Sequence, residues 1–279
     1  MQHSPKRFKT PENWYTDWLS QPYFVHVKTL FDLYGFGDFP TTKYLNQWIQ
    51  ERGITDIEFV CDEAIQGGQY AEQTAGLYYE EIIARCNFVP TRKNNWHDLF
   101  NALIWLLFPK SKKALNQLHM AEIKEHGLNP RTAVRNRVTH FDECGAVLVF
   151  ADEAHLEALQ GHRWVEAFVD CKNLWQQNTQ LFMFGHANYE MLLDPYLGLT
   201  GKYVAIKVEP EFYQLPLLQQ YAWLDDKLLE LIEQGALFEQ KAVLKPLPLL
   251  GIPGWDAANE DPEYYANQDY FRPLRKTIK

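Results

Sequence analysis

His97 lies in a segment, Asn94–Asn101, whose residue types could support catalysis or metal binding. If this segment is helical, His97, Asn101 and Trp105 stand at i, i+4 and i+8 and share one face. The helix dipole disfavours a charged imidazole in the first turn, so we expect a neutral His97 that acts as a ligand, a general base or a hydrogen-bond donor. A buried Asn101 needs a partner, because an unpaired amide costs about 1–3 kcal/mol. The alternative is a polar network in the core that joins this helix to its neighbours.

His186 and Glu190 stand one helical turn apart in the segment that begins at Gly185. This spacing suits a shared metal ion, or a carboxylate that orients an imidazole. Two ligands alone are a weak signal. An internal hydrogen bond between the two side chains at the start of a helix is the alternative.

The segment Thr139–Gly145 carries a histidine, two carboxylates and a cysteine. If residues 137–141 form a strand, His140 and Asp142 project to the same side of the chain. Asp142 and Glu143 are then candidate catalytic acids, and the alternative is an ordinary turn. No fixed base is implied beside the cysteine, which disfavours it as a nucleophile.

Positive charge is concentrated between Thr91 and His140, although the whole chain has a net charge of −9. This segment contains nine Lys or Arg residues and three acids, which gives +6 and leaves −15 for the rest of the chain. A basic island in an acidic protein indicates local contact with an anion. The alternative is that these cations line the solvated faces of helices. The candidate anion-binding residues are Arg92, Lys112, Arg135 and Arg137.

Together these residues favour a metal-dependent hydrolase that acts on a phosphate-containing small molecule or nucleotide. Imidazoles and carboxylates are ligands that zinc, manganese or magnesium accepts, and lysine or arginine binds phosphate. The expected catalytic residues are His97, Asp98, Asn101, Asp142 and Glu143, and the expected metal ligands are His186, Glu190 and His97. The alternative is a non-catalytic interaction protein whose basic segment 91–140 docks an acidic protein or nucleic acid. The negative net charge disfavours nucleic acid.

Several familiar motifs are incomplete in this chain. Val147–His155 is similar to the Walker B strand and DEAH box of a helicase, but no phosphate loop precedes it. Val204–Lys207 matches the kinase strand that carries the catalytic lysine, but the later kinase motifs do not follow. The four cysteines form no CxxC pair, and neither GxSxG nor HExxH occurs. The sequence therefore disfavours these enzyme and zinc-site classes.

The apolar pattern predicts an α+β fold in which helices and short strands alternate irregularly. The clearest element is a helix over residues 96–108, capped by Asn95 and apolar nearly all round, which we expect to be the central buried helix. The segment 77–89 fits either a strand or a helix, ended by Pro90. The other main elements that we expect are a helix over 112–126 capped by Ser111, a hairpin of strands 137–141 and 146–150, a helix capped by Asp152, a strand over 203–208 and a helix over 217–233.

Length and composition favour a single compact domain over residues 1–279. We expect residues 1–10 to be flexible and residues 245–279 to form an extended tail, rich in proline and aromatic residues, that packs on the body. No apolar stretch is long enough to span a bilayer, and the polar N-terminus does not fit a signal peptide. Scattered cysteines fit a reducing compartment. We therefore expect a cytoplasmic protein that does not bind membranes.

The run from Val89 to Asn116, which contains Asn95-Trp96-His97-Asp98-Leu99-Phe100-Asn101-Ala102, resembles a bacterial domain-of-unknown-function family, number 3025 in that series. The blocks Phe141–Gly145, Phe184–Ala187 and Leu250–Trp255 look like others of the same family. The resemblance covers most of the chain and implies a bacterial origin and one domain. It transfers no catalytic residue, because the members of the family have no assigned activity.

Overall fold

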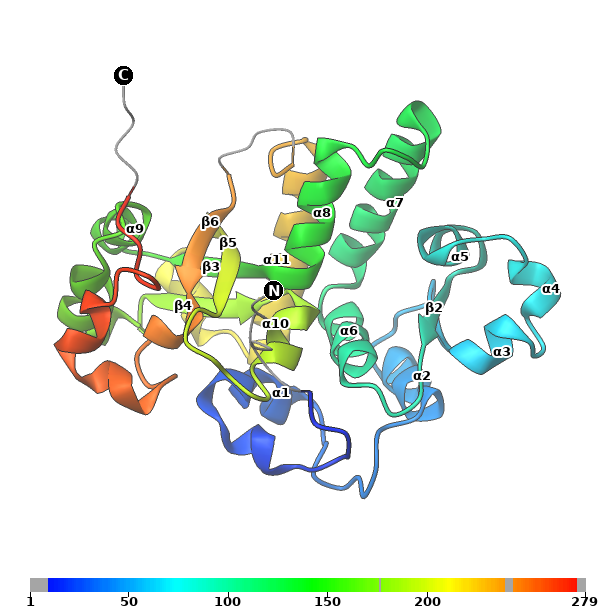
Figure 1. Ribbon diagram of the computed structural model, residues 1–279, viewed down its shortest axis with the longest axis horizontal. Helices are drawn as coiled ribbons and strands as arrows, with labels where there is room; N and C mark the ends of the chain where they lie inside the picture. The colour runs from blue at the N-terminus through cyan, green and yellow to red at the C-terminus, as the bar shows by residue number, and fades with distance from the viewer. Residues whose placement is uncertain (1–9, 176, 239–242, 275–279) are drawn as a thin grey trace, which may run out of the picture.

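The computed structural model describes residues 10–175, 177–238 and 243–274 of the chain (Figure 1). Residues 1–9, most of the segment that we expected to be flexible, lie outside the described residues, as do residues 275–279 of the tail. Helices and short strands alternate without a repeated unit, which confirms the α+β class. The elements up to residue 91 are α1 (Val25–Leu30), α2 (Thr42–Glu51), β1 (Glu58–Cys61), α3 (Asp62–Gln66), α4 (Ala71–Thr74), α5 (Tyr79–Cys86) and β2 (Phe88–Thr91). They are followed by α6 (Trp96–Leu107), α7 (Pro109–His126), α8 (Ala133–Cys144), β3 (Gly145–Phe150), α9 (Glu153–Gln160), β4 (Thr179–Met183), α10 (His186–Met191), β5 (Thr200–Lys207), α11 (Leu217–Glu233) and β6 (Lys245–Pro248).

Four strands form the main sheet in the order β4-β3-β5-β6. Strand β3 pairs in parallel with β5 and antiparallel with β4, and all six of its residues are buried. Burial on both faces explains why its sequence is a continuous apolar run rather than an alternating pattern. The second sheet contains β1 and β2, which pair in parallel. Figure 1 shows β2 grouped with α3, α4 and α5 on the side of α6 that lies away from the main sheet.

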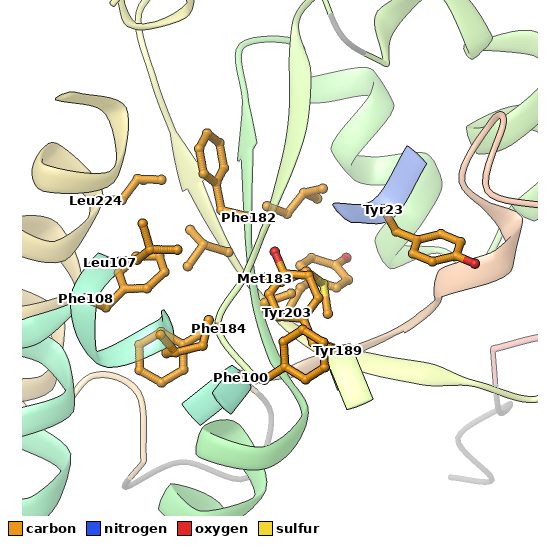
Figure 2. Packing of buried hydrophobic residues seen from close by; sticks show 14 of the residues in the cluster. Tyr23, Phe100, Leu107, Phe108, Phe182, Met183, Phe184, Tyr189, Tyr203 and Leu224 are labelled. Carbon is orange, nitrogen blue, oxygen red and sulfur yellow. The ribbon is translucent and has the colours of Figure 1, made fainter. Parts of the chain in front are cut away.

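Helix α6 is the buried helix that its apolar sequence predicts. Ten of its twelve residues are buried, and the Asn95 side chain accepts a hydrogen bond from the backbone N–H of Asp98 at 3.0 Å, which confirms the cap. Phe100 stacks on Tyr189 of α10 with ring centroids 5.4 Å apart, and Figure 2 shows the two rings together in the core. This contact ties α6 to α10, the two helices on which the candidate histidines lie. Within the described part of the chain, neither α6 nor any other helix is long and apolar enough to cross a membrane.

Residues 137–141 belong to helix α8, so the hairpin predicted with residues 146–150 is wrong. The buried residues Val138 and Phe141 lie three positions apart, which is the spacing of one helix face rather than of one strand face. The strand begins only at Gly145. A Cβ atom at this position would lie 2.2 Å from the backbone oxygen of Phe141, so a glycine is required for the close turn from α8 into β3.

The ambiguous segment 77–89 contains both helix α5 and the start of strand β2. Asn87 separates the two elements in the left-handed conformation, with φ of 57°, which asparagine tolerates better than most residues. Strand β2 continues through Pro90, contrary to the expectation that this proline ends the element. A proline is tolerated there because both strands of a two-stranded sheet are edge strands.

Helix α7 begins at Pro109 and not after a cap at Ser111, as the sequence suggested. Proline suits the first helical position because the N–H that it lacks would have no partner in the helix. Ser111 is buried inside the first turn, where its hydroxyl donates to Oδ1 of Asp225 in α11 at 2.6 Å. The serine therefore joins α7 to α11.

The C-terminal region packs on the body of the molecule, as predicted. Tyr265, Tyr270 and Phe271 are buried. The side chain of Asn259 donates to the backbone oxygens of Leu250 and Ile252, at 2.8 and 2.7 Å. Buried rings and satisfied backbone groups fix this tail although it contains little regular structure.

Candidate metal centre

Three side chains from three helices converge at one point of the structure. His97 lies in the first turn of α6, Glu143 in the last turn of α8, and His186 is the first residue of α10. Nε2 of His97 lies 3.0 Å from Nε2 of His186, and Oε2 of Glu143 lies 3.9 and 3.5 Å from these two nitrogens. Two ligands bound at about 2.1 Å to one tetrahedral ion are about 3.4 Å apart. These three side chains could therefore hold a metal ion.

Gly185 allows this convergence. A Cβ atom at Gly185 would lie 2.5 Å from both the backbone oxygen of Glu143 and the backbone nitrogen of Gly145. The backbone N–H of Gly185 also donates to the carbonyl of Gly145 at 2.7 Å. Because residue 185 has no side chain, the start of α10 lies directly against the end of α8, which places His186 beside Glu143.

Glu190 lies on the other side of His97 and does not join the three converging atoms. Its Oε2 atom lies 2.9 Å from Nδ1 of His97. The hydrogen bond to Glu190 raises the pKa of His97 above its usual value, which is opposite to the shift that we expected from the helix dipole. The carboxylate outweighs the helix dipole because it touches the ring directly. Burial lowers the pKa of His186 to about 3, which keeps that ring neutral.

A second polar network lies next to this group and confirms that Asn101 has partners. The side-chain N–H of Asn101 donates to the hydroxyl of Tyr79 at 3.0 Å, and its Oδ1 accepts from Nζ of Lys112 at 2.9 Å. Lys112 is only 4% exposed and also forms an ion pair with Asp142. Burial alone would raise the pKa of Asp142, but the charge of Lys112 and the hydrogen bond that it donates hold this pKa below its usual value.

Both groups open into a cavity of about 400 Å³, a size that suits a small-molecule ligand. One wall is a face of α7, where Lys112, Asn116 and His119 follow one another at i, i+4 and i+7. Burial lowers the pKa of His119, which favours the neutral form of the ring. The sequence reasoning missed Asn116 and His119 as cavity residues, and their helical spacing from Lys112 was the signal that could have found them. The residues that line the cavity include Asp62, Tyr79, Glu80, Arg92, His97, Asp98, Asn101, Trp105, Lys112, Asn116, His119, Arg131, Thr139, Asp142, Glu143 and His186.

The comparison with family models matches residues 57–275 of the 279-residue chain to a protein family of unknown function, DUF3025. The chain belongs to this family. No curated protein and no solved structure matched the chain. The DUF3025 region contains all three converging residues and the whole α7 wall of the cavity.

The candidate anion-binding residues of the DUF3025 region separate into two groups. Arg92 lines the cavity and forms a two-point ion pair with Asp98, at 2.9 and 2.8 Å. Arg135 and Arg137 are not among the described residues that line the cavity, and they donate to the backbone oxygens of Leu128 and Phe238. The structure places another arginine of the same basic segment, Arg131, at the cavity, where it donates to the hydroxyl of Thr139.

Cys144 follows Glu143 at the end of α8. Burial raises the pKa of its thiol to about 11. The thiolate is the reactive form of cysteine, and little of it forms at neutral pH with so high a pKa. This agrees with the expectation that the cysteine is not a nucleophile.

Proposed function

We propose that this protein is a metal-dependent hydrolase that acts on a phosphate-containing small molecule or nucleotide. The observation that carries the proposal is the spacing of three ligand atoms, on His97, Glu143 and His186, at the wall of a cavity. Two imidazoles and one carboxylate form the ligand set of many catalytic zinc centres, which keep a further position open for water. A bound divalent ion would make that water a nucleophile near neutral pH. Zinc or manganese fits the nitrogen-rich donor set better than magnesium does.

The phosphate part of the proposal is supported by the cations of the cavity. Lys112, Arg92 and Arg131 all line it. Two of the three amino protons of Lys112 are used by Asn101 and Asp142, which leaves a third for a phosphate oxygen. Arg131 contacts a neutral hydroxyl and keeps its full charge for an anion.

The remaining residues that we expected to be catalytic have supporting roles in this proposal. Asp98 holds the guanidinium of Arg92, and Asp142 and Asn101 hold the ammonium of Lys112. Held in this way, the cations are oriented before a substrate binds, and the cost of ordering them is already met by the fold.

The alternative of a basic docking segment is weakened by how its charges are used. At least five of the nine cations between residues 91 and 140 form ion pairs with other described residues of the molecule. An acidic partner would have to compete with carboxylates that are already in place. A phosphate at Arg92 or Lys112 would meet the same competition, so this observation weighs only against docking at Lys93, Lys110 and Lys113. The five pairs are Arg92 with Asp98, Lys93 with Glu63, Lys110 with Asp226, Lys112 with Asp142, and Lys113 with Asp56.

The test is the metal content of untagged protein purified without chelator, measured by elemental mass spectrometry. We expect near-stoichiometric zinc or manganese that is lost in His186→Ala and retained in His126→Ala, a control at an exposed histidine. The metal-loaded protein is then assayed against phosphomonoesters, phosphodiesters, carboxylic esters and amides. Absence of metal, with no melting shift on adding zinc, manganese or magnesium, would refute the metal centre. Hydrolysis of carboxylic esters or amides alone would refute the phosphate substrate.

A further inference from the structure

The two ring nitrogens of His97 face different partners. Nε2 points to His186 and Glu143, whereas Nδ1 lies 2.9 Å from Oε2 of Glu190. A histidine that binds a metal through one nitrogen usually donates its other N–H to a carboxylate or carbonyl. This second contact fixes the tautomer, so that the lone pair of the ligating nitrogen faces the ion.

We propose that Glu190 is a positioning residue of the metal centre and that Thr10 holds Glu190 in place. The inference rests on the metal centre of the proposed function and adds a part of the chain that the family match does not include. Glu190 turns the ring of His97 toward the shared point and increases the basicity of its ligating nitrogen. It acts through His97 and does not itself bind the ion.

Both carboxylate oxygens of Glu190 are engaged. Oε2 contacts Nδ1 of His97, and Oε1 accepts a hydrogen bond from the hydroxyl of Thr10 at 3.0 Å. A carboxylate held at both oxygens has one orientation, and among the described residues Glu190 is not in the group of side chains that converge at His186. This arrangement distinguishes Glu190 from Glu143, whose oxygen lies 3.5 Å from Nε2 of His186.

The segment that carries Thr10 is anchored to the helix of His97. Trp14 stacks on Trp96, with ring centroids 5.2 Å apart and an interplanar angle of 15°. Trp96 is buried and directly precedes His97 in the first turn of α6. The family match begins at residue 57, so Thr10 and Trp14 lie before it. Residues outside the matched region therefore complete the surroundings of the candidate ligands.

The test measures metal affinity rather than catalysis. Zinc dissociation constants are obtained by competition with a chromophoric chelator for the wild-type protein, Glu190→Gln, Thr10→Val and Glu143→Gln. The visible absorption of the Co²⁺-loaded protein reports the coordination geometry of each variant. Matched controls are Glu233→Gln and Thr29→Val, two exposed positions of the same residue types. Circular dichroism confirms that each variant is folded.

We expect Glu190→Gln to weaken zinc binding about 10- to 100-fold, with Co²⁺ absorption that is shifted but still typical of the wild-type coordination number. We expect a smaller loss for Thr10→Val, no change for the controls, and the largest loss for Glu143→Gln, which removes a ligand. Wild-type affinity in Glu190→Gln would overturn the inference and leave the hydrolase proposal intact. A Co²⁺ spectrum of lower coordination number in Glu190→Gln, with zinc loss equal to that of Glu143→Gln, would make Glu190 a ligand and overturn its positioning role. A wild-type protein that binds no zinc or cobalt would overturn both proposals, whereas bound metal without hydrolysis would refute the proposed function alone.

Discussion

Lys112→Met tests how strongly the buried ion pair with Asp142 stabilises the wall of the cavity. Breaking a buried pair by removing one partner costs about 3–5 kcal/mol when the remaining charge is fully buried. The side chain of Asp142 is 27% exposed, so water in the cavity reaches the carboxylate and lowers this cost. Methionine also removes the ammonium that lies 5.4 Å from the ring centroid of Trp105, and Asn101 loses a donor. We therefore expect a loss of about 2–3 kcal/mol in the free energy of unfolding.

The free energies of unfolding are measured by urea unfolding, which is monitored by far-ultraviolet circular dichroism. The proteins compared are the single variants Lys112→Met and Asp142→Asn and the double variant Lys112→Met/Asp142→Asn. The double variant leaves no unpaired charge, so we expect it to be more stable than the single variants suggest, with a coupling energy of about 2 kcal/mol. Lys227→Met is the control, since it breaks an exposed pair with Glu230 and should cost less than about 1 kcal/mol. A loss in Lys112→Met no larger than in this control, or single losses that simply add in the double variant, would refute the reasoning.

Three further predictions concern groups in the body of the fold. Burial lowers the pKa of His26 from 6.5 to about 4. The neutral ring therefore makes its full contribution to the free energy of unfolding above pH 6.5, and this contribution is lost as the pH falls toward 4. The loss in the free energy of unfolding should be about 2 kcal/mol, since the ring is partly reachable by water. His26→Gln should reduce the pH dependence of this free energy in urea titrations between pH 6.5 and 4. The same pH dependence in the variant and the wild-type protein would contradict the prediction. Phe100 is fully buried, so Phe100→Ala should lower the free energy of unfolding in urea by about 3–5 kcal/mol. A loss below about 1 kcal/mol would contradict this, because it would show that the core closes around the space left by the deleted ring. Asn95→Ala removes the cap on the N–H of Asp98 and should cost about 1 kcal/mol, whereas Asn95→Asp should retain most of that stability.

The parts of the fold that could be predicted are those in which local sequence and burial agree. The all-round apolar pattern of α6 and its Asn95 cap are both local signals, and the structure confirms both. Residues 137–141 show the limit of such reasoning. With residues 146–150 they looked like two strands paired around a turn at residues 142–145, but packing of Val138 and Phe141 selected a helix. For a segment this short, tertiary contacts outweigh intrinsic preference.

The candidate site shows the same limit in the roles of two carboxylates. Spacing along the chain favoured Glu190, one turn from His186, as the metal ligand, and it left Glu143 in a presumed turn. Only the contact of α10 with the end of α8 brings Glu143 to His186, and no sequence spacing encodes that contact. The distances then separate the roles, because 2.9 Å from Glu190 to His97 is a hydrogen bond, whereas 3.5 and 3.9 Å from Glu143 to the two imidazoles are too long for good ones. A carboxylate held near both rings, at about the 3.4 Å that separates two ligands of one ion, favours metal binding.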